Sequence, residues 1–139
     1  MSKLFISLFL FVSIVSGAEK SNWTHTHKYT LKKDEIASIG TSTTESKGLD
    51  KSSLFFSWTT IVGDRVTVLL NHKGYPHQYI LYKKRSLDRV KLYLLPDGSN
   101  QMIDRSYLLL VLADINQANS EVSFDILIKD DKNRILVEF

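Results

Sequence analysis

An apolar run near the carboxyl end of this 139-residue chain limits its fold more than any other feature. The run covers residues 107–115, and the polar, turn-like residues 116–120 follow it. It is too short to cross a bilayer as a helix, which takes about 20 apolar residues. A run that is apolar on both faces is typical of a strand covered on both sides, or of a buried helix.

The segment that follows distinguishes between these two structures. Over residues 122–129 apolar side chains alternate with polar ones, and Leu127 is the one exception. Alternation with a period of two, directly after a short polar turn, is typical of a β-hairpin. We therefore predict that residues 107–115 form a central strand paired with residues 122–129.

Similar alternation recurs along most of the chain, in short segments separated by turn-forming residues. A short strand, or one turn of helix, is predicted at 36–39, and the polar residues 40–53 predict one long loop. We predict an all-β fold, an antiparallel immunoglobulin-like β-sandwich of about eight strands. A small up-and-down β-barrel is the alternative, because a series of short turns fits it too. The remaining predicted strands are 22–31, 54–62, 66–72, 77–84, 90–95 and 134–139.

The first residues have the pattern of a secretory signal peptide. Lys3 precedes an apolar stretch at 4–15, and small residues at 16–18 fit a cleavage site. We predict cleavage after Ala18, which leaves a single β-sandwich domain at 19–139 with no transmembrane helix. The mature chain is then exported to a periplasm, the cell surface or the extracellular space. The absence of cysteine fits a bacterial periplasm and removes thiol chemistry.

Composition and motifs argue against two classes of function. The formal charge of +3 is mild, whereas nucleic-acid-binding proteins usually show a strong, clustered excess of basic residues. The chain has no GxSxG elbow, no P-loop and no GxGxxG, so we expect no enzyme. We predict a small binding protein that contacts a protein or cell-surface partner.

Tyrosines and basic residues gather between positions 75 and 89 and form the predicted contact site. Tyrosine and arginine are common anchors of protein interfaces. The alternatives are that the tyrosine rings pack in the core or at its rim, and that the basic side chains are a solvated strand edge. The candidate binding residues are Tyr75, Tyr79, Tyr82, Lys84, Arg85 and Arg89.

Two pairs of histidines suggest a metal site. His25 and His27 lie two apart on a predicted strand, so both rings project from one face. His72 and His77 flank residues 73–76, and a four-residue hairpin loop there would place the two rings opposite each other. Imidazole suits zinc or copper. A periplasmic histidine-based metal-binding protein is thus one alternative function, and a β-barrel that binds a small ligand is another. The histidines also fit strand edges without any metal.

Overall fold

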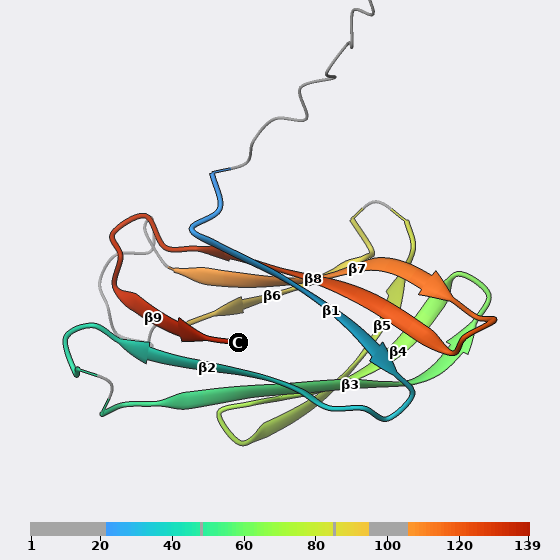
Figure 1. The fold of residues 1–139 in the computed structure, drawn as a ribbon, viewed down its shortest axis with the longest axis horizontal. Helices are drawn as coiled ribbons and strands as arrows, with labels where there is room; N and C mark the ends of the chain where they lie inside the picture. The colour runs from blue at the N-terminus through green and yellow to red at the C-terminus, as the bar shows by residue number, and fades with distance from the viewer. Residues whose placement is uncertain (1–21, 48, 85, 95–105) are drawn as a thin grey trace, which may run out of the picture.

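The computed structural model describes residues 22–47, 49–84, 86–94 and 106–139. These residues form nine β-strands in two antiparallel sheets that lie face to face (Figure 1). The four-stranded sheet has the order β1-β8-β7-β6, and the five-stranded sheet has the order β5-β4-β3-β2-β9. The bounds are β1 His25–Lys32, β2 Ala37–Thr43, β3 Ser52–Val62, β4 Arg65–His72, β5 Tyr75–Tyr82, β6 Arg89–Tyr93, β7 Tyr107–Asn116, β8 Glu121–Lys129 and β9 Ile135–Glu138.

The predicted antiparallel β-sandwich is confirmed, and the up-and-down barrel is wrong. The described strands β5 and β6 follow each other in the chain, yet they belong to different sheets and do not pair. Closure fails there because the turn after β5, in which the Tyr82 amide donates to the Leu87 carbonyl, carries the chain across to the other layer. Consecutive hairpins, rather than the interleaved order of immunoglobulin constant domains, build most of both sheets.

The hairpin predicted at 107–129 is confirmed as β7 and β8. Strand β7 lies between β8 and β6, and its side chains from Tyr107 to Ala113 are buried or half-buried on both faces, as the apolar run predicts. On its outer face Leu109 is only 8% exposed. Lys91 is its partner on β6, and the Lys91 ammonium lies 4.2 Å from the centre of the Tyr107 ring. A long lysine side chain stretched over this face shields apolar surface from water.

Aromatic side chains fill the space between the sheets. The Phe56 ring of β3 meets the Phe124 ring of β8 edge to face, with 5.5 Å between the ring centres. The Tyr29 ring of β1 meets Phe56 at the same distance. The Trp58 indole N–H donates a 2.8 Å hydrogen bond to the Leu31 carbonyl, which joins β3 to β1 in the interior. Contacts of side chains therefore hold the two sheets together, and none of the described strands belongs to both sheets.

The long loop predicted at 40–53 is wrong at both ends, where its residues belong to strands. Strand β2 continues to Thr43 and β3 begins at Ser52, since threonine and serine suit a half-buried pleated surface. Asp50 organises the turn that remains. Its carboxylate accepts hydrogen bonds from the Thr43 amide, the Thr43 hydroxyl and the Ser46 hydroxyl. These bonds, with that of Ser46 first, lower the pKa of Asp50 to about 2.

Substitution of two neighbouring phenylalanines on β3 tests which face of this strand points into the core. Phe56 is buried between the sheets and Phe55 points outward, 43% exposed. We expect Phe56→Ala to lower the free energy of unfolding by roughly 3–5 kcal/mol, because it leaves a cavity in the core. Phe55→Ala should cost well under half as much, as measured by guanidinium titration. Equal losses would contradict the assigned faces.

Candidate functional site

The predicted contact residues do not lie together on one surface. Tyr75 begins β5, and Lys84 follows its end, so they are separated by a strand of 8 residues, roughly 26 Å in length. Arg89 begins β6, which belongs to the other sheet. Arg85 lies outside the described residues. Tyr75 is the most open of the described tyrosines in this group, with 71% of its surface exposed.

The tyrosines of β5 divide between its two faces, as alternation requires. Tyr79 pairs with Val68 on the inner side and packs, partly buried, against the core. Tyr82 pairs with Arg65 on the outer side and is half-buried. Tyr79 is thus a packing residue, which was the alternative considered for it. Tyr75 and Tyr82 remain candidates for surface contact.

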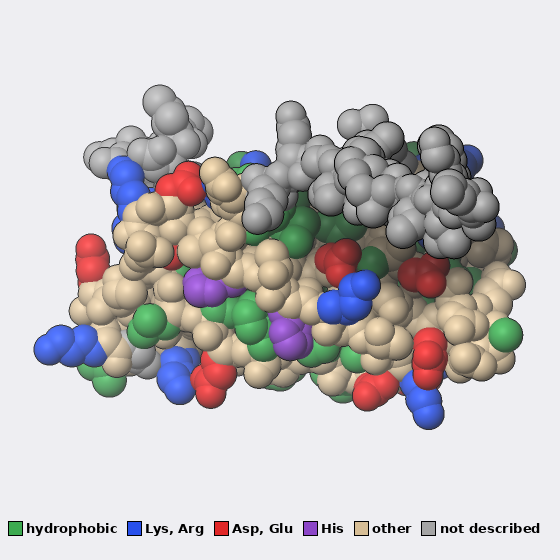
Figure 2. Space-filling view, turned by 45° about the horizontal axis from the view of Figure 1, so that its top comes forward, with side chains coloured by type: hydrophobic (Ala, Val, Ile, Leu, Met, Phe, Trp, Pro, Cys, Tyr) green, Lys and Arg blue, Asp and Glu red, His purple; other side chains and the backbone are tan. Residues whose placement is uncertain are grey.

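Nearby carboxylates oppose the basic charge in this part of the chain. The Lys84 ammonium lies 4.0 Å from Asp64, and the Lys83 ammonium lies 2.6 Å from Asp114. The face shown in Figure 2 carries lysine or arginine and acidic side chains interspersed. That face therefore shows no patch of charged side chains of one sign.

The two histidine pairs lie in different sheets, with His25 and His27 on β1 and His72 and His77 on β4 and β5. His27 on β1 stacks on Phe139, with 4.6 Å between ring centres and 11° between ring planes. The turn between β4 and β5 has two residues, Lys73 and Gly74, both with positive φ, rather than the predicted four. A two-residue turn of this kind matches the twist of the strands.

This shorter turn changes the partners of the second histidine pair. His72 lies opposite Tyr75, and His77 lies opposite Leu70, so the two histidines are offset diagonally rather than directly opposed. Throughout the described ranges, no group of three or more histidine, cysteine, aspartate or glutamate side chains is placed to hold a metal ion. The proposed four-histidine arrangement has no geometric support.

His72 has a different property, because its ring is partly buried. Its Nε2 atom is inaccessible to water and has no hydrogen-bond partner among the described residues. Burial, and then the nearby charges of Lys73 and His77, lower the pKa of His72. The folded chain therefore favours the neutral imidazole.

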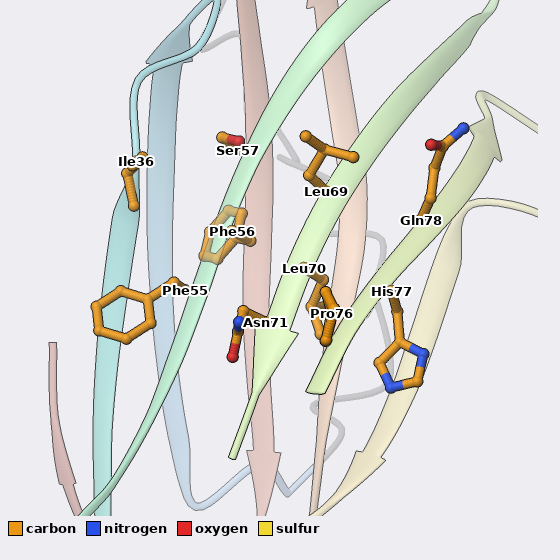
Figure 3. Close-up of a pocket in the computed structure, with 10 residues that line it drawn as sticks. All are labelled: Ile36, Phe55, Phe56, Ser57, Leu69, Leu70, Asn71, Pro76, His77 and Gln78. Atoms are coloured by element: carbon orange, nitrogen blue, oxygen red, sulfur yellow. The ribbon is translucent and has the colours of Figure 1, made fainter. Parts of the chain in front are cut away.

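A shallow apolar groove lies on the outer face of the five-stranded sheet (Figure 3). Its volume is about 440 Å³, and its sides come from β3, β4 and β5 together with Ile36, which precedes β2. Phe55 and Leu69 supply exposed apolar surface, and Asn71 and Gln78 supply amides. We call this the sheet groove. It is lined by Ile36, Phe55, Phe56, Ser57, Leu69, Leu70, Asn71, Pro76, His77 and Gln78.

The sheet groove was not predicted, although the sequence held a signal for it. Phe55 precedes Phe56, and Leu69 precedes Leu70, within segments of alternating character. Two adjacent apolar residues on a strand point to opposite faces, so one of each pair must point away from the core. What the sequence did not show was the register of β3 on β4, with its shift after Trp58, which brings Phe55 and Leu69 to the same patch.

No protein-family model, curated protein or solved structure matches this chain. The described ranges contain no helix with the length and apolar character needed to span a bilayer. The argument about function therefore depends on the geometry of the surface.

The burial of His72 predicts a pH-dependent stability. The unfolded chain takes up a proton near the ordinary pKa of 6.5, and the folded chain does so at lower pH. The contribution of the buried, neutral His72 to stability is therefore fully present above about pH 6.5 and is lost as the pH falls below that value. We expect His72→Phe to flatten this decline, measured by denaturant midpoints at about pH 8 and about pH 5. His25→Phe is the control and should preserve the decline. An unchanged pH dependence in His72→Phe would disprove the role of His72.

Proposed function

We propose that this chain is an exported binding protein whose sheet groove and strand β5 contact a protein partner outside the cell or in the cell envelope. The observation that carries the proposal is the exposed apolar groove on an open sheet face. Export rests on the signal peptide predicted at residues 1–18, which lie outside the described residues.

The composition of the sheet groove supports contact with a protein. Contiguous exposed apolar surface on a small protein often marks an interaction site. Phe55 and Leu69, 43% and 42% exposed, provide an apolar centre. Asn71 and Gln78 at the same site can donate and accept hydrogen bonds, which gives an interface its orientation.

The predicted contact residues contribute unequally to this proposal. Tyr82 lies at the end of β5 on the outer face, and the exposed Tyr75 lies at its start on the same side as Tyr79, so the two can extend the contact along the strand. Lys84 and Arg85 follow that strand, and Lys84 is a candidate for contact with a carboxylate of the partner. Arg89 belongs to β6 and already holds Asp88, at 2.8 Å, so we leave it out of the contact surface.

A photo-crosslinking experiment in the cells that make the protein tests this proposal. The crosslinking amino acid benzoylphenylalanine replaces Phe55 in one variant and Lys28, on the outward face of β1 in the other sheet, in the control. We expect one discrete adduct from position 55 and none from position 28.

A second substitution should remove that adduct. Leu69→Asp places an unpaired charge in the sheet groove, so we expect at least about a tenfold loss of crosslinked product. Circular dichroism and the melting temperature establish that the variant is folded. Absence of an adduct at position 55, equal adducts at both positions, or no effect of Leu69→Asp would each count against the sheet groove.

A further inference from the structure

The four edge strands of the sandwich differ in how they are protected against pairing with other chains. Proteins usually block such pairing with charged side chains, proline, short strands or covering loops. Strand β1 carries two lysines, β6 carries Arg89 and Lys91, and β9 has only 4 residues. Strand β5 has 8 residues and no charged side chain, although Pro76 near its start has no N–H to donate. Beyond Pro76, β5 is therefore the described edge most open to an added strand.

The backbone of β5 shows which groups are available. The two-residue turn makes His72 and Tyr75 the first hydrogen-bonded pair, and pairs of this type recur at every second residue. The backbone N–H and C=O groups of Gln78 and Ile80 consequently point away from β4. No described residue donates to or accepts from them. The Tyr82 amide, which also points outward, is already bonded to Leu87 at 3.0 Å, so the open stretch ends at Ile80.

Side chains beside this edge give the added strand a surface to cover. Ile80 is 51% exposed on the outer face, next to the row that contains Leu69 and Gln78. Every second side chain of an added strand would lie on this face and extend the apolar surface of the sheet groove. On the other face it would lie beside His77 and Tyr79. Backbone bonds and alternate side chains thus act together.

The charges at the two ends of β5 indicate the partner. Lys73 precedes the strand and Lys84 follows it, whereas the strand itself is uncharged. Lys84 is 70% exposed in its side chain and its contact with Asp64 is long, at 4.0 Å. Two copies of β5 paired antiparallel would set Lys73 of one copy near Lys84 of the other at both ends. Such like-charge contacts disfavour a second copy and favour a strand with acidic ends.

We propose that β5 binds an extended segment of another protein as an additional β-strand, with an uncharged β-forming centre and acidic residues at both ends. This inference rests on the proposed function and specifies its partner. The segment would hydrogen-bond to Gln78 and Ile80 and place its acidic ends near Lys73 and Lys84.

A phage-displayed library of random dodecapeptides, selected against the whole protein, is the first test. We expect enrichment of peptides with a β-branched or aromatic centre flanked by aspartate or glutamate. The Lys73→Glu/Lys84→Glu double variant should bind these peptides at least tenfold more weakly. Failure to enrich any peptide, enrichment without acidic ends, or equal binding by the double variant would overturn the inference.

A matched pair of variants tests whether the peptide pairs through the backbone. Gln78→Pro removes an N–H that points away from β4, and Gln78→Thr removes the same side chain but keeps that N–H. We expect Gln78→Pro to bind the enriched peptides at least tenfold more weakly than Gln78→Thr, at similar melting temperatures. Equal binding by the two variants would rule out the added strand.

Amide exchange gives a measurement that does not depend on the proline variant. In the wild-type protein, the bound peptide should slow exchange at Gln78 and Ile80 at least tenfold, as followed by NMR. Unchanged exchange at these two amides would overturn the inference even if Gln78→Pro does not fold. Sedimentation decides the other occupant, since a dimer that Gln78→Pro abolishes would assign the edge to a second copy.

The two proposals can fail separately. If crosslinking from position 55 persists at full strength in Gln78→Pro, the sheet groove binds a partner and the added strand is wrong. If peptides bind at β5 and position 55 yields no adduct, the added strand stands and the sheet groove is not the contact surface.

Discussion

The contact between the inner faces of the two sheets is the interaction on which this molecule depends. The chain has no cysteine, so no disulfide can stabilise it. Phe56 and Phe124 meet between the sheets, and the Trp58 indole bonds across to Leu31. Burial of apolar area contributes roughly 25 cal/mol per Å², and in a domain of this size it must offset the loss of chain entropy. Each strand therefore commits one face to the interior.

This commitment leaves the outer faces and the strand edges for function. The aromatic core occupies the space between the sheets, and the sheet groove lies on the opposite side of the five-stranded sheet. An open sandwich also has edges, which a closed barrel would not have. Strand β5 is both an edge and a wall of the sheet groove, so the two surfaces proposed for binding are continuous.

Local patterns predicted most of the strands, and they failed where one or two residues change the geometry. The alternation at 122–129 was sufficient to place the hairpin, because both strands and their turn are adjacent in sequence. It was not sufficient for His72 and His77, since a turn of two rather than four residues changes every cross-strand partner. Bulges after Trp58 and Leu112 also change the alternation, and they let Ile61 and Ile115 pack against the core.

The sequence by itself determined where most of the strands lie, and which face of each avoids water up to the bulges. Both follow from a period of two, which is a local property of the chain. Only the tertiary structure decided which strands far apart in the sequence are neighbours. It pairs β1 with β8 and β2 with β9, and it leaves β5 at an edge (Figure 1). Pairing over such separations depends on how the two inner faces fit together. For that reason the sheet groove and the open backbone of β5 exist only in the folded molecule.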